Sequence, residues 1–143
     1  MSWRNLYGAL YNWYSVNNAS GLCPTGWHVP GYAEWTTLTN FAGGESVAGG
    51  KLKSTRTAPT EHPRWDSPNT EATDQYGFSA LPGGYRGSNG NFGYVGSSGL
   101  LWSATEYSST NVWYRSMTYE YGSVFRPNSY KTYGFSVRCV RDQ

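Results

Sequence analysis

Charged residues, histidines and long apolar runs are all scarce in this chain. Of its 143 residues 14% are charged and two are histidines, and the net charge is +2. No basic cluster is present, so the sequence gives no reason to expect a nucleic-acid partner. No run of about 18 apolar residues occurs, so we expect no membrane span. The first residues, Met1-Ser-Trp-Arg-Asn, do not form a signal peptide.

Aromatic residues and glycine are abundant instead. There are 13 Tyr, 7 Trp and 18 Gly, a composition typical of short strands and ordered loops. Long helices need more Ala, Leu, Glu and Lys, and disordered chains have fewer aromatics. The length fits one domain, which we expect to span residues 1–143.

Two helices are predicted near the start of the chain. Trp3, Leu6, Leu10 and Trp13 recur at spacings of three and four, which predicts one helix of about three turns over residues 3–16.

The second helix is expected to follow Gly31. Glu34 then stands at the third helical position, where a carboxylate meets unpaired N–H groups, and Gly43-Gly44 ends the helix. Its expected buried stripe consists of Trp35, Leu38 and Phe41. A short extended piece over residues 26–30 precedes this helix, and residues 45–75 show little regular pattern.

From residue 77 onward, short alternating runs separated by Gly, Ser or Asn predict strands. The expected strands are 78–81, 84–86, 100–104, 112–119, 123–126 and 134–141. Two helices followed by a small twisted antiparallel sheet with long ordered loops is an α+β arrangement.

The cysteines Cys23 and Cys139 allow two interpretations. They form one disulfide across nearly the whole chain, or they are two buried free thiols. A disulfide would join the first helical region to the last strand, and closing so long a loop stabilises a fold by roughly 4–5 kcal/mol in the loop-entropy model.

Seven motifs along the chain resemble those of one family. They are LYGALYNWY (6–14), LCPTGWHVP (22–30), AEW (33–35), GKLKS (50–54), GFSALPGGYR (77–86), WSATE (102–106) and YGFSVRCVRD (133–142). Together they resemble the Fibrobacter succinogenes major paralogous domain, which is abundant in secreted and surface proteins of Bacteroidetes and their relatives. The resemblance implies an extracellular or cell-surface location.

The resemblance also implies a C-type-lectin-like fold, related to the formylglycine-generating enzymes. Variable proteins of diversity-generating retroelements use this fold as well. Hypermutation at adenines there turns Asn codons into codons for Tyr, Ser, Thr, Asp and His, and residues 107–130 are rich in such outcomes. The chain therefore resembles a variable protein.

One departure from the family concerns an N-terminal strand that usually precedes the first helix. This chain starts almost at the helix, so we expect the terminal strand over residues 134–141 to lack a partner. An open edge invites pairing with another chain, which makes a homodimer through this edge an expectation.

No catalytic constellation is recognisable. His28 lies inside a framework motif, where a structural role is expected, and His62 lies in a proline-flanked loop, where we expect it to be solvated. The formylglycine-generating enzymes need two cysteines close together in the active site, whereas Cys23 and Cys139 lie in different framework motifs. The sequence therefore indicates a non-enzymatic protein without a cofactor.

Calcium is the one metal that the sequence brings into consideration. Asp66, Asn69, Glu71 and Asp74 place oxygen atoms within one loop, and calcium takes six to eight oxygen ligands. The spacing is not that of an EF-hand, and such side chains in loops more often cap turns.

The aromatic residues fall into two groups. Framework motifs and helix stripes hold Trp3, Trp13, Trp27 and Trp35, which we expect in the core, and Trp102, Trp113 and Tyr114 are expected to belong to the frame. The later aromatics alternate with Ser, Thr and Asn, as they do in antibody paratopes. The expected ligand-binding residues are Tyr107, Asn111, Ser116, Thr118, Tyr119, Glu120, Tyr121, Ser123, Phe125, Asn128 and Tyr130, with Tyr94 as an outlier.

These observations lead to three hypotheses. The first is a module that displays this Tyr/Asn/Ser-rich surface to a protein or glycan ligand. The second is a structural or adhesive surface module without a ligand of its own, in which the later aromatics pack the sheet. The third is an oxidase of the formylglycine-generating type.

Overall fold

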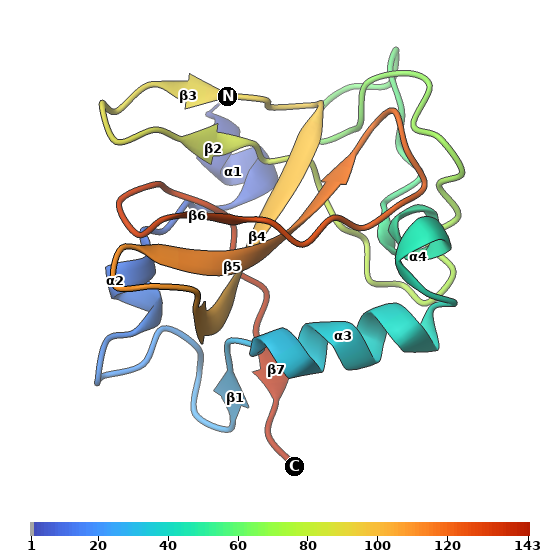
Figure 1. Cartoon of the computed structure of the whole chain (residues 1–143). Coiled ribbons are helices and arrows are strands. Elements are labelled where there is room, and N and C mark those ends of the chain that lie inside the picture. Colours follow the sequence, from blue (N-terminus) through green and yellow to red (C-terminus); the bar gives the residue numbers. More distant parts are fainter. Residues whose placement is uncertain (1) are drawn as a thin grey trace.

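The computed structural model describes residues 2–143 and confirms the α+β class. Its centre is a three-stranded antiparallel sheet in the order β4 (Ser98–Glu106), β5 (Asn111–Thr118), β6 (Asn128–Tyr130). β5 is the middle strand, with Leu101 of β4 opposite Arg115 and Ser129 of β6 opposite Val112. Helix α3 (Tyr32–Phe41) runs along the lower side of this sheet in Figure 1.

The chain before β6 continues the same edge of the sheet. Phe125 forms an isolated bridge with Ser116, and the N–H of Tyr114 donates to the carbonyl of Pro127. The segment from residue 124 to 130 therefore accompanies β5 along most of its length, although only its last three residues form a regular strand. The predicted strand at 123–126 is reduced to this single bridge.

The terminal strand is partnered, contrary to expectation. β7 (Val140–Arg141) pairs with β1 (Trp27–His28), and both lie at the bottom of Figure 1. Upstream, Gly134 bridges Arg86 and Phe135 bridges Tyr11. The expected lack of a partner is wrong, and the argument for a homodimer through this edge loses its basis.

A disulfide joins Cys23 to Cys139 next to this pair of strands. The two cysteines are 116 positions apart, and within the described chain no cysteine is free. Of the two interpretations of the cysteines, the structure therefore has the disulfide.

A separate hairpin, β2 (Tyr85–Arg86) with β3 (Phe92–Gly93), lies at the top of Figure 1, above α1 (Trp3–Tyr7). Tyr85 is opposite Gly93, and Arg86 is opposite Phe92. Because successive side chains of a strand point to opposite faces, Tyr85 occupies one face of the hairpin while Arg86 and Phe92 share the other. A Cβ atom on Gly93 would lie 2.6 Å from the Tyr85 ring, so this position needs glycine.

The predicted helix over residues 3–16 is broken into two. α1 ends at Gly8, which has a φ of 85°, and α2 (Trp13–Val16) begins after Asn12, whose side chain accepts a hydrogen bond from the N–H of Ser15. Between them Tyr11 bridges Phe135. Because Gly8 has a left-handed backbone conformation and Tyr11 is bridged to Phe135, the chain does not form the single helix that the spacing of its apolar residues predicts.

Helix α3 is confirmed, with Gly31 as its N-cap and a hydrogen bond from the Gly31 N–H to the Glu34 carboxylate. Phe41, however, is 70% exposed and does not belong to the buried stripe. A further helix, α4 (Glu45–Leu52), occupies part of the segment without a sequence pattern. Beyond it, 78–81 forms no regular strand, and Ala80 only bridges Lys53.

The core consists of two clusters, one on either side of the long β4–β5 pair. One contains Trp35, Leu52, Trp65 and Met117, and the other contains Trp13, Trp102, Val112 and Phe135. Of the tryptophans expected in the core, Trp13 and Trp35 are buried, whereas Trp3 and Trp27 are about half exposed. Those two lie at the periphery, on α1 and on the two-residue strand β1.

No helix among residues 2–143 is long and apolar enough to cross a membrane.

Candidate functional site

Most of the residues expected to bind a ligand are accessible. They lie at the tip of the β4–β5 hairpin, on β5, and along the segment that returns to β6. The exposed ones are Tyr107, Glu120, Tyr121, Phe125 and Tyr130, and the half-buried ones are Asn111, Thr118, Tyr119, Ser123 and Asn128. Ser116 is buried on the middle strand, where it is paired with Leu100 of β4 and bridged to Phe125. We therefore remove Ser116 from the candidate surface.

The first part of this surface is a row of aromatic rings beside α3. The ring of Trp113, which is half buried, packs edge-on between Tyr107 at 4.9 Å and Tyr32 at 5.1 Å (ring centroids). Arg126 donates to the hydroxyl of Tyr32 over 2.6 Å and pairs with Glu45 over 2.7 Å. The hydrogen bond to Tyr32 raises the pKa of Arg126. We call these five residues the Trp113 row.

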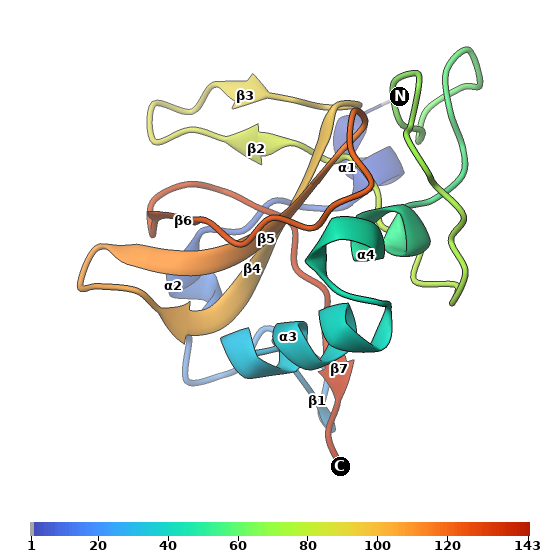
Figure 2. The ribbon, with the colours of Figure 1, turned by 45° about the vertical axis from the view of Figure 1, so that its right-hand side comes forward.

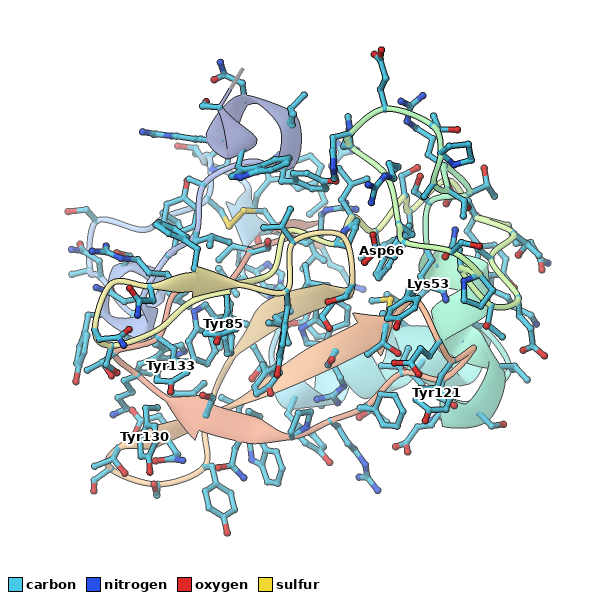
Figure 3. All side chains as sticks on the ribbon, turned by 90° about the horizontal axis from the view of Figure 1, so that it is seen from above. Lys53, Asp66, Tyr85, Tyr121, Tyr130 and Tyr133 are labelled. Carbon is cyan, nitrogen blue, oxygen red and sulfur yellow. A yellow bond between two sulfur atoms is a disulfide. The ribbon has the colours of Figure 1, made fainter. Side chains whose placement is uncertain are left out.

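The second part is a tyrosine cluster that the sequence analysis largely missed. Tyr85 stacks on Tyr133 at 6.0 Å and meets Tyr94 edge-on at 5.1 Å, while Tyr130 lies 6.0 Å from Tyr133. Figure 3 shows Tyr85, Tyr133 and Tyr130 following one another along one side of the molecule. Tyr85 and Tyr133 stand in family motifs, so their pattern gave no signal of an exposed role; only Tyr94 stood out, as an outlier.

Tyr94 has an unusual backbone conformation. Its φ is +64°, which is rare for a bulky residue. Its ring is nevertheless exposed, and its neighbour Tyr114 is half buried, with a pKa raised by burial and by the proximity of Tyr94. Strained positions of this kind cluster at ligand-contacting sites, which supports the inclusion of Tyr94.

The third part is the loop that connects β5 to β6. Tyr121 and Phe125 pack edge-on at 5.9 Å, while Tyr119 packs partly against the core. The negative charge of the adjacent Glu120 raises the pKa of the Tyr119 hydroxyl.

A buried lysine anchors this loop. The Lys53 ammonium donates to the carbonyls of Thr70, Thr118 and Tyr121, each over 2.9 Å, and lies 5.4 Å from the Trp65 ring centroid. Figure 3 shows Lys53 and Tyr121 on the same side of the molecule. Burial lowers the pKa of Lys53 to about 8. One side chain thus joins α4, the 69–75 loop and the candidate surface.

The tip of the β4–β5 hairpin is held by local hydrogen bonds. The N–H groups of Tyr107 and Ser108 both donate to the carbonyl of Asn111. The Asn111 amide in turn donates to the Asn128 side chain over 3.0 Å, which connects the tip to β6. The aromatic side chains therefore project from a backbone that is already ordered.

Both histidines have side-chain partners within the fold. His28 lies between two carboxylates, with Nδ1 bonded to Asp142 and Nε2 to Glu34. The hydrogen bonds to Asp142 and Glu34 raise the pKa of His28. This arrangement joins β1, the start of α3 and Asp142, which follows β7. His62 is not freely solvated, because it is half buried against Trp3 and bonded to the Tyr7 hydroxyl.

Two of the four calcium candidates, Asp66 and Asp74, have other partners for their carboxylates. Asp66 pairs with Arg64 over 2.6 Å, and Asp74 caps Ser79 by accepting from both its N–H and its hydroxyl. Asn69 is buried, with its amide nitrogen donating to Ser54 and Thr57. Within residues 2–143 no three His, Cys, Asp or Glu side chains form a metal cluster. Asp66 and Asp74 thus pair and cap within the fold, whereas the buried side-chain oxygen of Asn69 has no hydrogen-bond partner in the described part of the chain.

Taken together, these features define a small α+β domain that is closed by one disulfide and carries aromatic side chains on ordered loops. A model of the Fibrobacter succinogenes major domain matches residues 2–141, and the chain belongs to this family. No curated protein and no solved structure matches the chain.

Proposed function

We propose that this domain is a non-enzymatic binding module whose ligand, a protein or a glycan, contacts three groups of residues: the Trp113 row, the tyrosine cluster and the 119–125 loop. We propose further that the domain has the C-type-lectin-like fold, acts outside the cell or on its surface, and is a variable protein diversified by a retroelement.

One observation carries the proposal. Tyr107, Tyr121 and Tyr130 are 57%, 54% and 56% exposed, yet each stands on backbone that hydrogen bonds hold in place. Tyrosine offers a large contact area for little loss of side-chain freedom, and an ordered backbone lowers the entropy cost of binding further. A surface that only packed the sheet would not leave these rings half in solvent.

The alternatives differ in what they require of these residues. A structural or adhesive module without its own ligand would use the frame alone, so the exposed rings could be exchanged freely. The oxidase alternative requires a pair of reactive cysteines, whereas Cys23 and Cys139 are bonded to each other beside β1 and β7. The exposed rings therefore favour the binding module.

The test is binding of the labelled domain to a microarray of defined glycans and purified extracellular proteins. A triple variant, Tyr107→Ala with Tyr121→Ala and Tyr130→Ala, should lose the signals that the unmodified domain gives by at least tenfold. The matched control replaces three exposed aromatic residues outside the surface, Tyr14→Ala with Phe41→Ala and Tyr76→Ala. This control should bind like the unmodified domain.

Equal binding by both triple variants would favour the structural module. Both should keep their melting temperatures within a few degrees, since surface substitutions alter stability by less than about 0.5 kcal/mol each. The retroelement is tested by the genomic DNA. We expect a near-copy of the 3′ coding end beside a reverse-transcriptase gene, and its absence would overturn that part of the proposal.

A further inference from the structure

A cavity of about 410 Å³ lies between α1 and the hairpin β2–β3, away from the proposed contact surface. Its walls include the aromatic rings of Trp3, Tyr7, Tyr11 and Phe92. Arg4 and Arg86 are the charged residues among those that line it. Ligand sites commonly combine an apolar hollow of this size with a few polar groups that fix the orientation of the ligand.

The hairpin separates this cavity from the tyrosine cluster. Arg86 and Phe92 face each other across the hairpin on one side, whereas Tyr85 points to the other side, toward Tyr133. The cavity therefore does not depend on the function proposed for the tyrosine surface.

Two of the aromatic side chains that line the cavity are exposed to solvent. Trp3 is 51% exposed and Phe92 is 68% exposed. Tyr7, in contrast, is buried and fixed, since its hydroxyl accepts a hydrogen bond from the N–H of Arg64 over 3.0 Å. The cavity thus has one rigid aromatic wall and two rings whose apolar surface a ligand would remove from water.

The side chains of Arg4 and Arg86 are exposed and make no hydrogen bond or ion pair with the described residues. The side chains of Arg56, Arg64, Arg115, Arg126 and Arg138 all donate hydrogen bonds within the fold. In the described residues, Arg4, Arg86 and Arg141 have no side-chain hydrogen bond or ion pair, and two of these three line the cavity. Unpaired guanidinium groups beside an apolar wall favour a carboxylate, which they bind in a bidentate manner.

The guanidinium of Arg86 lies 5.9 Å from the centroid of the Phe92 ring, and both side chains are exposed. The charge and one aromatic wall of the cavity are therefore neighbours on the same face of the hairpin.

We infer that this cavity binds an aromatic monocarboxylate, with the ring between Trp3 and Phe92 and the carboxylate on Arg4 and Arg86. Binding requires both the negative charge and the ring of the ligand. The arginines bind the carboxylate, and the aromatic side chains of the cavity bind the ring.

The experiment uses three probes with the ¹⁵N-labelled full chain, followed by NMR titration. They are 3-phenylpropionate, its neutral amide, and propionate, which lacks the ring. We expect saturable shifts of the Trp3 indole N–H and of the Arg4 and Arg86 side-chain N–H signals with 3-phenylpropionate. The amide and propionate should each bind at least fivefold more weakly.

Variants separate the two contributions. Arg4→Gln with Arg86→Gln should weaken binding of 3-phenylpropionate at least fivefold while leaving the amide unaffected. Arg141→Gln, which removes an unpaired guanidinium elsewhere, is the control and should change nothing. The inference is overturned if 3-phenylpropionate gives no saturable shifts up to about 10 mM, a range that covers very weak binding, if amide and acid bind equally, or if the shifts lie outside the cavity.

Discussion

The Nζ atom of Lys53 lies 2.9 Å from the carbonyl oxygen of Tyr121, so a fully buried charge supports the backbone of a loop that carries exposed aromatic side chains. Two more carbonyls, of Thr70 and Thr118, accept from the same ammonium group. A contact surface that tolerates changes in its outer side chains can be supported in this way, because the lysine binds only main-chain atoms of the loop.

Lys53→Met is expected to destabilise the fold strongly. It leaves three inward-facing carbonyls without their donor, and each buried acceptor left unsatisfied costs about 1–3 kcal/mol. Urea denaturation measures the loss. Lys51→Met, on the same helix but without these carbonyl contacts, is the control and should lose less than about 0.5 kcal/mol. A loss of less than about 1 kcal/mol for Lys53→Met would show that the three bonds do not hold the loop.

Gly49→Ala should displace the 119–125 loop, because the added methyl group would collide with its backbone. A Cβ atom at this position would lie 2.2 Å from the carbonyl oxygen of Ser123, and overpacking of this kind costs about 1–3 kcal/mol. We expect lower stability together with NMR shifts concentrated in residues 121–125. Ser46→Ala, on an exposed position of the same helix, is the control, and equal behaviour of the two variants would contradict the close approach.

The ion pairs of His28 should make stability depend on pH. Because the pKa of His28 is raised above 6.5, the folded state holds this proton more tightly than the unfolded state does. The stabilisation is therefore complete below pH 6.5 and disappears as the pH rises through the raised value. Burial opposes the shift of Glu34, but hydrogen bonds from Gly31 and His28 lower its pKa below 4.5, so its contribution is lost in acid.

The stability difference between the unmodified chain and His28→Gln should thus be largest between pH 4.5 and 6.5. Denaturant titrations at a series of pH values measure this difference, and NMR gives the pKa of His28 directly. A difference that stays constant from pH 5 to 9 would mean that the two ion pairs contribute nothing to folding.

Removal of the disulfide should cost the fold a large part of its stability. In the loop-entropy model a bond that closes a loop of 116 positions contributes roughly 4–5 kcal/mol. The double variant Cys23→Ser with Cys139→Ser, compared with the oxidised chain in guanidinium, should show this loss. A reducing agent should shift the midpoint of the oxidised chain and leave that of the double variant unchanged; a shift in both would point to an effect unrelated to the bond.

The strand and helix patterns in the sequence predicted much of the architecture, but they did not predict where the first helix is interrupted. The alternation around Trp113 predicted β5, and the signals at Gly31 and Glu34 predicted the start of α3. The break at Gly8 could not be predicted, because it depends on the pairing of Tyr11 with Phe135, more than 120 positions away.

Residues of the candidate surface could be predicted where aromatic residues alternate with Ser, Thr and Asn in the sequence. Tyr107, Tyr121 and Tyr130 follow this pattern and are exposed. Ser116 follows it too but is buried, because neighbours on both edges of a middle strand cover it. Tyr85 and Tyr133 were expected in the framework from their family motifs, and both do pack partly against a core cluster; their contacts with exposed Tyr94 and Tyr130 could not be predicted, because they depend on the hairpin stacking on the segment near residue 133.

The bond between Cys23 and Cys139 also determines how the domain would respond to tension. The described ends of the chain lie at opposite poles of the molecule in Figure 2. A force that pulls on both ends passes through the segment before Cys23, crosses the sulfur atoms, and leaves through the few residues after Cys139. Residues 24–138, which include the proposed contact surface and the whole central sheet, lie outside this path. The intact bond therefore prevents end-to-end extension of residues 24–138, and tension would first act on the segment before Cys23, which carries Trp13 of one core cluster.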